Sequence, residues 1–280
     1  MFERLKPMSA AGISRRNFCK LSSSIVLGSV FTGIKSRLSF GLDSSVAHAE
    51  THTPKLIMPA MTANGAHVPI VVKMNHPMER DHHIARIQFL NESDPIPSKG
   101  VFYPTPYNGE VYFALQARMH SGKSTVLAVT ECNLHGRWTA RHEITIPEGQ
   151  GGCATAGGGK ELNVKEEILP PAIRIPELVR RGRLNKGETA EVQVKFKHPS
   201  KTGLAYENGK FIQIEEPLYL SSMRVYYGDR LVSRYEMTAG LSDSPFLKFK
   251  IKFLEEKPLR IFFRNSRGQE FKAVTEVALS

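Results

Sequence analysis

Hydrophobic and polar residues alternate with a period of two along much of the chain. Val192, Val194 and Phe196 point to one side of an extended backbone, and the polar residues between them point to the other. The segment 246–253 shows the same alternation of aromatic or aliphatic residues with lysines. This period is typical of a half-buried β-strand. Apolar residues with helical spacing do not extend beyond two turns anywhere, so the pattern predicts an all-β protein.

Short runs of β-branched and aromatic residues recur every eight to twelve residues and are bounded by Gly, Pro, Asn or Asp. In the first half of the chain these runs are Val68–Met74, Ile84–Leu90, Val111–Met119, Thr125–Cys132 and Trp138–Ile146. In the second half they are Ala172–Ile175, Ala190–Phe196, Leu218–Tyr227, Leu231–Met237, Phe246–Phe253, Leu259–Arg264 and Glu270–Leu279. Strands without helical crossovers favour antiparallel sandwiches. We therefore expect two β-sandwich domains, at residues 50–148 and 168–280.

The first 49 residues have the pattern of an export signal. Ser14–Lys20 reads S-R-R-N-F-C-K, a short apolar segment follows, and Ala47-His48-Ala49 offers small residues for cleavage. This pattern resembles a twin-arginine signal and predicts a periplasmic mature chain that begins at Glu50. The alternative is a mildly hydrophobic N-terminal helix anchored by basic residues. No stretch of 18 apolar residues is present, so we expect no membrane span.

Composition narrows the possible functions. The 280 residues are 41% hydrophobic and 23% charged, which is typical of a globular protein and excludes a disordered or collagen-like chain. The formal net charge of +11 falls to +6 without residues 1–49, which carry seven Lys or Arg and two acidic residues. Nearly half of the basic character therefore belongs to the signal. We expect no nucleic-acid partner, and we expect the remaining positive charge to steer acidic partner surfaces.

A glycine-rich segment at 149–167 separates the two predicted domains. Six of the eleven residues at 149–159 are glycine, and Cys153 stands among them. Such a segment behaves as a flexible coil, so we expect an exposed thiol on a mobile arm. The predicted hinge residues are Gly151, Gly152, Gly157, Gly158 and Gly159. A thiol on an arm suits a covalent carrier, and the alternative is an inert interdomain linker.

At these residues the chain resembles a known family. The first half is similar to SoxY, through its export signal, the segment 63–69 and Gly151-Gly152-Cys153. The second half is similar to SoxZ, through 173–176, 197–199 and 244–246. The resemblance implies two immunoglobulin-like sandwiches, in agreement with the strand pattern. It also implies that Cys153 holds a sulfur-containing intermediate, such as a thiosulfate-derived adduct, for partner enzymes.

The arm departs from the family pattern, because Ala154 follows the cysteine and the arm continues into the second domain. Fused carriers of this kind also resemble a group associated with quinoprotein dehydrogenases. The expected partners are therefore periplasmic redox enzymes: c-type cytochromes and hydrolases by resemblance, or a quinoprotein dehydrogenase system. The sequence predicts no cofactor.

Other residue patterns give weaker signals. Cys132 ends an apolar run and is expected to be a partly buried core thiol, with a disulfide to Cys153 as the alternative. His76, His82 and His83 match no metal-ligand template, so we expect solvated loop histidines and no metal site. No catalytic motif is present, and we expect a protein that is not an enzyme. The alternatives to a carrier are an accessory protein for a redox enzyme and a thiol enzyme, which would need a base beside Cys153.

Overall fold

The computed structural model describes residues 49–154 and 167–280. The predicted export signal up to residue 48, and the predicted hinge residues Gly157, Gly158 and Gly159, lie outside the described residues. Within the described ranges, no helix combines the length and the apolar character that crossing a bilayer requires.

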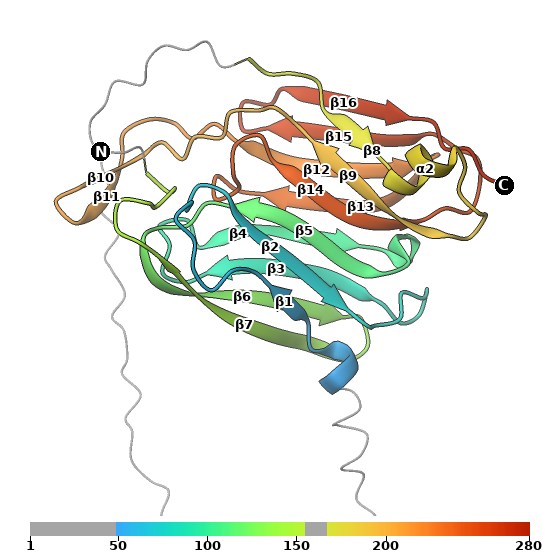
Figure 1. The fold of residues 1–280 in the computed structure, drawn as a ribbon, viewed down its shortest axis with the longest axis horizontal. Helices are drawn as coiled ribbons and strands as arrows, with labels where there is room; N and C mark the ends of the chain where they lie inside the picture. The colour runs from blue at the N-terminus through green and yellow to red at the C-terminus, as the bar shows by residue number, and fades with distance from the viewer. Residues whose placement is uncertain (1–48, 155–166) are drawn as a thin grey trace, which may run out of the picture. The chain divides into compact units, whose positions relative to one another are not determined.

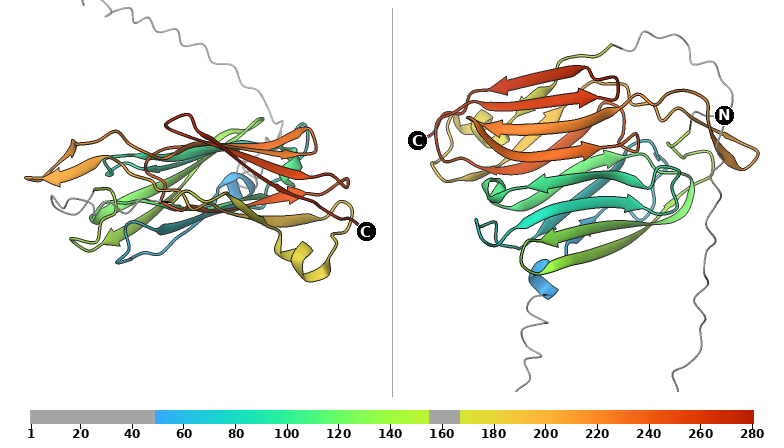
Figure 2. Two further views of the ribbon diagram at one scale, coloured as in Figure 1. Left: turned by 90° about the horizontal axis from the view of Figure 1, so that it is seen from above. Right: turned by 180° about the vertical axis from the view of Figure 1, so that it is seen from behind.

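Two antiparallel sheets form the fold (Figure 1). The first has six strands, in the order β1 (Lys55–Ile57), β2 (Val68–Met74), β5 (Val111–Ala117), β14 (Phe246–Lys252), β9 (Thr189–Lys195) and β8 (Ala172–Arg174). The second has eight, in the order β16 (Glu270–Thr275), β15 (Leu259–Asn265), β12 (Leu220–Tyr227), β13 (Arg230–Met237), β4 (Ser98–Pro104), β3 (Ile84–Asn91), β6 (Gly122–Cys132) and β7 (Gly136–Ile146). Figure 2 shows them as two layers. The predicted all-β class of two immunoglobulin-like antiparallel sandwiches is confirmed.

Each half of the sequence contributes three strands to the first sheet and four to the second, and the halves join edge to edge. In the first sheet β5 pairs with β14, where Phe113 lies opposite Phe249. In the second sheet β4 pairs with β13, where Phe102 lies opposite Tyr235. Both sheets are therefore continuous across the two halves, which the sequence pattern did not predict.

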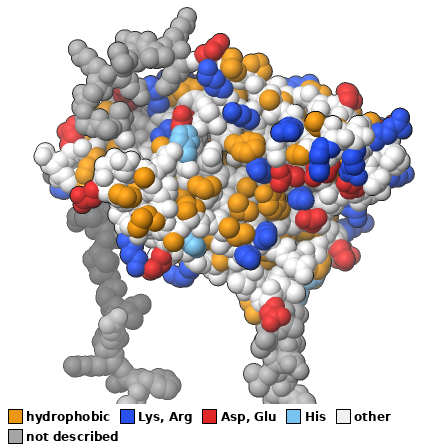
Figure 3. Space-filling view, viewed as in Figure 1, with side chains coloured by type: hydrophobic (Ala, Val, Ile, Leu, Met, Phe, Trp, Pro, Cys, Tyr) orange, Lys and Arg blue, Asp and Glu red, His pale blue; other side chains and the backbone are white. Residues whose placement is uncertain are grey.

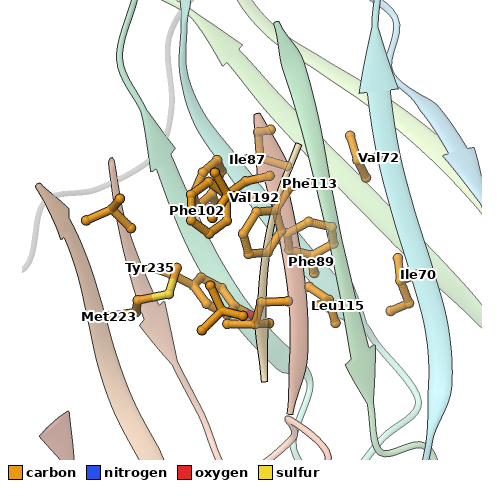
Figure 4. Close-up of a cluster of buried hydrophobic side chains, with 14 of the residues drawn as sticks. Ile70, Val72, Ile87, Phe89, Phe102, Phe113, Leu115, Val192, Met223 and Tyr235 are labelled. Atoms are coloured by element: carbon orange, nitrogen blue, oxygen red, sulfur yellow. The ribbon is translucent and has the colours of Figure 1, made fainter. Parts of the chain in front are cut away.

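A buried aromatic cluster packs between the sheets where the halves meet (Figure 4). The rings of Phe102 and Phe113 stack with centroids 4.0 Å apart, and Tyr235 meets Phe113 edge-on at 4.9 Å. The Tyr235 hydroxyl is buried and donates a hydrogen bond of 2.7 Å to the Lys99 carbonyl oxygen. Large buried rings contribute strongly to core stability, so this cluster holds the two halves together.

Some elements lie outside the predicted runs. The strands β10 (Leu204–Glu207) and β11 (Lys210–Gln213) form a separate two-stranded sheet among the described residues. The 3-10 helix η1 (Pro106–Asn108) follows β4, and the helix α2 (Pro176–Arg181) ends at Gly182, whose φ of 73° is left-handed. In Figure 3 apolar side chains show between charged ones over the middle of one face, and basic side chains gather at the end where α2 lies.

Candidate functional site

The segment that carries Cys153 is docked against the first half of the molecule. The Gly65 N–H donates to the Gln150 carbonyl oxygen at 2.9 Å, and the Gly152 N–H donates to the Met119 carbonyl oxygen at 2.8 Å. Gly65 and Gly151 form a parallel bridge. These bonds give the segment the character of a short added strand rather than of a free coil.

Gly151 and Gly152 serve close packing here, which differs from the predicted hinge role. A Cβ on Gly152 would overlap the backbone of Ala66, and a Cβ on Gly151 would lie 2.7 Å from the Ser121 nitrogen. Glycine is the residue that allows two backbones to approach this closely. The glycines are therefore explained by the docked position of the segment.

The Cys153 thiol is buried, with 1% of the residue exposed. The prediction of an exposed thiol on the arm is therefore wrong for this structure. The Sγ atom donates a hydrogen bond of 3.3 Å to Oδ1 of Asp94 in the β3–β4 loop. Burial, and then the charge of Asp94, raise the pKa of the Cys153 thiol far above its usual range. The docked form thus holds a protonated, poorly nucleophilic thiol.

Asp94 is itself held by a buried ion pair. Its Oδ2 lies 2.8 Å from Nζ of Lys99 on β4, and both side chains are almost fully buried. Lys99 also donates to the Ile96 carbonyl oxygen at 2.8 Å, and the His120 N–H donates to Asp94 Oδ1 at 2.6 Å. A charge in the interior costs several kcal/mol unless it is paired in this way. The pair fixes the carboxylate that faces Cys153.

Residues from both halves close the site. The Thr202 hydroxyl, just before β10, donates to the Cys153 carbonyl oxygen at 2.8 Å. Arg118, just after β5, donates to the Gly152 carbonyl oxygen at 3.0 Å and forms an ion pair with Asp243 at 3.3 Å. Sequence reasoning found Cys153 but missed these neighbours, because single polar residues in loops carry no spacing signal. The arrangement holds the thiol away from solvent, so a reaction at Cys153 requires that its sulfur first become exposed.

A second group of chemistry-bearing side chains lies at the other end of β6. His52 lies in a short helical turn before β1, and His76 and His82 lie between β2 and β3. Cys132 is the last residue of β6, and His135 lies in the β6–β7 turn. His76 is 6% exposed and His82 is half-buried. The prediction of solvated loop histidines is therefore wrong for these two residues and for His83, which is also half-buried. The half-buried ring of the adjacent His83 lies outside the group.

Four ligand-type atoms in this group lie within 4.8 Å of one another, on His52, His82, Cys132 and His135. Nε2 of His52 is 2.9 Å from Nδ1 of His135 and 3.4 Å from Nε2 of His82. Sγ of Cys132 is 3.6 Å from the same His135 nitrogen. The spacing C-x-x-H across the β6–β7 turn and the six-residue spacing of His76 and His82 were the available sequence signals. Without His52, which lies far away in the sequence, neither spacing points to one site.

His76 completes the group. Its ring centroid lies 4.5 Å from that of His52 and 4.6 Å from that of His82. Its Nδ1 lies 2.6 Å from the Pro77 carbonyl oxygen, whereas its Nε2 is buried without a hydrogen-bond partner. Burial lowers the pKa of His76 to about 4, helped by the neighbouring histidines, so the ring is neutral at pH 7.

The two thiols lie at opposite ends of β6. Gly151 packs against Ser121, which precedes the strand, and Cys132 is its last residue. Eleven residues of strand span roughly 30 Å, because each residue adds about 3.3 Å. Both cysteines are free. The alternative of a Cys132–Cys153 disulfide is thus not met in this structure.

Comparison with solved structures gives partial likenesses. A superoxide reductase (neelaredoxin) from Ignicoccus hospitalis is 31% identical over 36% of this chain and 86% of that chain, with a TM-score of 0.31. One from Archaeoglobus fulgidus in the reduced form is 25% identical over 35% of this chain and 92% of that chain, with a TM-score of 0.26. At these scores the likenesses carry no argument about this chain. No curated protein matches the sequence.

Family models give a consistent assignment. The model of the sulfur oxidation protein SoxY matches residues 42–153, so that its last matched residue is Cys153. The model of the sulphur oxidation protein SoxZ matches residues 179–276. The two matches lie in tandem, do not overlap and together cover most of the chain. The chain therefore belongs to the SoxY and SoxZ families of sulfur-oxidation proteins, as a fusion of the two.

Proposed function

We propose that this chain is a periplasmic carrier protein that holds a sulfur-containing intermediate covalently on Cys153 and presents it to partner enzymes. The observation that carries the proposal is the tandem of SoxY and SoxZ domains, with Cys153 at the end of the first. The export signal predicted for residues 1–49 supports the compartment.

The docked thiol defines a closed state of this carrier. In that state Cys153 is protonated beside Asp94 and shielded from oxidants. Three features hold it there: a short set of backbone bonds, Thr202 and Arg118. Loss of these few contacts frees the thiol without unfolding either sheet. A partner that competes for them would therefore load the carrier.

Loading with thiosulfate is an oxidation and needs an electron acceptor. The Cys153 thiol and thiosulfate form an S–S bond and release one proton and two electrons. A c-type cytochrome is the electron acceptor that the family resemblance implies. Hydrolysis of the resulting thiosulfonate consumes one water, releases sulfate and a proton, and leaves a persulfide on Cys153. The chain itself supplies the attachment point in both steps.

The test is mass analysis of the chain purified without reductant from its native periplasm, after growth with a reduced sulfur source. We expect sulfur or thiosulfonate increments on the peptide that contains Cys153. The Cys153→Ser variant should carry none, and Glu148→Gln, on the same segment, should match the wild type. An unmodified Cys153 under every growth condition would overturn the proposal.

A second candidate is an accessory protein for a periplasmic redox system, such as a quinoprotein dehydrogenase, in which residues 149–154 only anchor the linker. The burial of Cys153 favours it. The Cys153→Ser variant separates the two functions, because a carrier loses all activity in the assembled system and an accessory protein retains it.

A further inference from the structure

We propose that the residues gathered around Cys132, at the end of β6, bind one divalent first-row transition-metal ion through four imidazoles and one thiolate. The ligands are His52, His76, His82, His135 and Cys132. This site is separate from Cys153 and does not depend on the proposed carrier function.

The distances among the donor atoms fit one shared ion. Metal–nitrogen bonds of about 2.1 Å and metal–sulfur bonds of about 2.3 Å place neighbouring ligand atoms about 3 to 4 Å apart. The separations of 2.9 Å and 3.4 Å around Nε2 of His52, and of 3.6 Å from Cys132 Sγ to His135 Nδ1, agree with that range. Three segments that are far apart in the sequence bring these atoms together, which local sequence does not require.

His76 gives an independent reason to place an ion here. Its Nδ1–H donates to the Pro77 carbonyl oxygen, which leaves the lone pair on Nε2. That Nε2 is buried with no partner, among the rings of His52 and His82. A buried polar atom without a partner costs about 1–3 kcal/mol. A metal ion satisfies it, and a backbone bond to the opposite ring nitrogen is the usual way in which proteins orient a metal-binding histidine.

Further contacts hold the ligands in place before an ion arrives. Nδ1 of His52 lies 2.9 Å from the Thr51 hydroxyl, which leaves its Nε2 directed at the other donors. The ring of Trp138 packs 5.4 Å from that of His52. His135 is exposed, so the site is reached from solvent. A preorganised site with one open side suits a metal that also binds an exogenous ligand.

The donor set selects the class of metal. Calcium and magnesium prefer oxygen ligands, and none of the five side chains offers a carboxylate. Structural zinc is almost always four-coordinate, whereas this group has five donors. Imidazole suits zinc, copper, iron and nickel, but copper(II) and nickel(II) are typical of square-planar or tetragonal sites of nitrogen and oxygen ligands. A set of five ligands that includes a thiolate therefore fits iron, which takes five or six ligands, better than the other three metals. We therefore infer iron(II) as the resident ion. On binding, the Cys132 thiol releases its proton and its sulfur bonds the metal.

The test uses the full chain, first by elemental analysis after purification without chelators. We expect about one iron per chain. The metal-free chain is then titrated with Co(II), whose bond to a thiolate gives an intense near-ultraviolet band. Cys132→Ser should lose that band, and His76→Gln should weaken Co(II) binding at least about tenfold. His83→Gln, in the same loop, and Cys153→Ser, the other thiol, are the controls and should bind as the wild type does.

Several results would overturn the proposal. One is a chain that purifies without metal and gives no cobalt band. Another is a band that survives in Cys132→Ser or disappears in Cys153→Ser. Purification with zinc alone, combined with unchanged Co(II) binding by His76→Gln, would overturn the five-ligand iron site. Circular dichroism checks the folding of each variant. If Cys132→Ser does not fold, His135→Gln at the exposed turn takes its place, with weakened Co(II) binding expected and unchanged binding contradicting the site.

Discussion

Cys153 and Cys132 are both buried and both free, but their surroundings differ in kind. Cys153 faces a carboxylate that is fixed by a buried lysine. Cys132 faces imidazole nitrogens, with His135 Nδ1 3.6 Å from its sulfur. A carboxylate favours the protonated thiol, whereas imidazole nitrogens are metal ligands that can share one ion with a thiolate. Burial alone therefore does not determine the chemistry of a cysteine. The polar atoms that face its sulfur determine it.

The surroundings of Cys153 differ from those of Cys132 first because of the buried ion pair between Lys99 and Asp94. Lys99→Met leaves Asp94 charged and buried without its partner, so we expect a loss of about 3–5 kcal/mol in the free energy of unfolding. Urea denaturation measures this loss. Lys123→Met is the matched control, because it breaks the exposed pair with Glu143 and should cost at most about 1 kcal/mol. Equal losses in the two variants would contradict a role for Lys99 in fixing Asp94.

The docked position of Cys153 can be broken without touching either thiol. Gly152→Ala places a methyl group against the Ala66 backbone, which cannot move aside. It should destabilise the docked position of the segment by roughly 1–3 kcal/mol. We expect Cys153 to react faster with a thiol reagent in this variant, while Cys132 reacts as before. Gly149→Asn is the control, since nothing lies near its Cβ position and asparagine tolerates its φ of 76°. An unchanged Cys153 rate in Gly152→Ala would mean that the segment is not held by this contact.

A smaller effect should appear in the dependence of stability on pH. The pKa of Cys153 is raised in the folded chain, so the unfolded chain loses its thiol proton first as pH rises. The contribution of the Cys153 thiol to the free energy of unfolding is complete below a pH of about 8.5. Above that pH it falls by up to about 1.4 kcal/mol per pH unit. Denaturation of wild type and Cys153→Ser between neutral and alkaline pH measures the difference. Parallel curves for the two proteins would show that the docked thiol ionises as freely as an exposed one.

The strand pattern predicted much of the fold, because period-two alternation depends only on local sequence. The predicted run Val68–Met74 coincides with β2, and most other runs differ from the observed strands by a few residues. β4 was missed because Lys99 and Gly100 interrupt its apolar pattern, and both residues are explained only by tertiary contacts. Lys99 pairs with Asp94, and Gly100 has a φ of 128° where a Cβ would meet Tyr235.

The candidate sites were harder to predict for the same reason. The glycines around Cys153 predict mobility when read locally, but in the fold Gly151 and Gly152 permit contact with residues far away in the sequence. The metal-ligating residue types were visible, yet 24 positions separate His52 from His76, and 50 separate His82 from Cys132. Only the packing of three segments far apart in the sequence brings them together. Local sequence patterns thus predict individual strands, whereas the candidate sites depend on contacts between segments that are far apart in the sequence.

The pairing of β5 with β14 and of β4 with β13 has a consequence for how this protein is made. If the two halves were produced as separate polypeptides, each would expose two unpaired strand edges, which are templates for self-association. Covalent linkage keeps the complementary edges close together at any dilution and fixes a one-to-one ratio between them. Fusion therefore assembles the two halves within one chain, independent of how much of the protein is made.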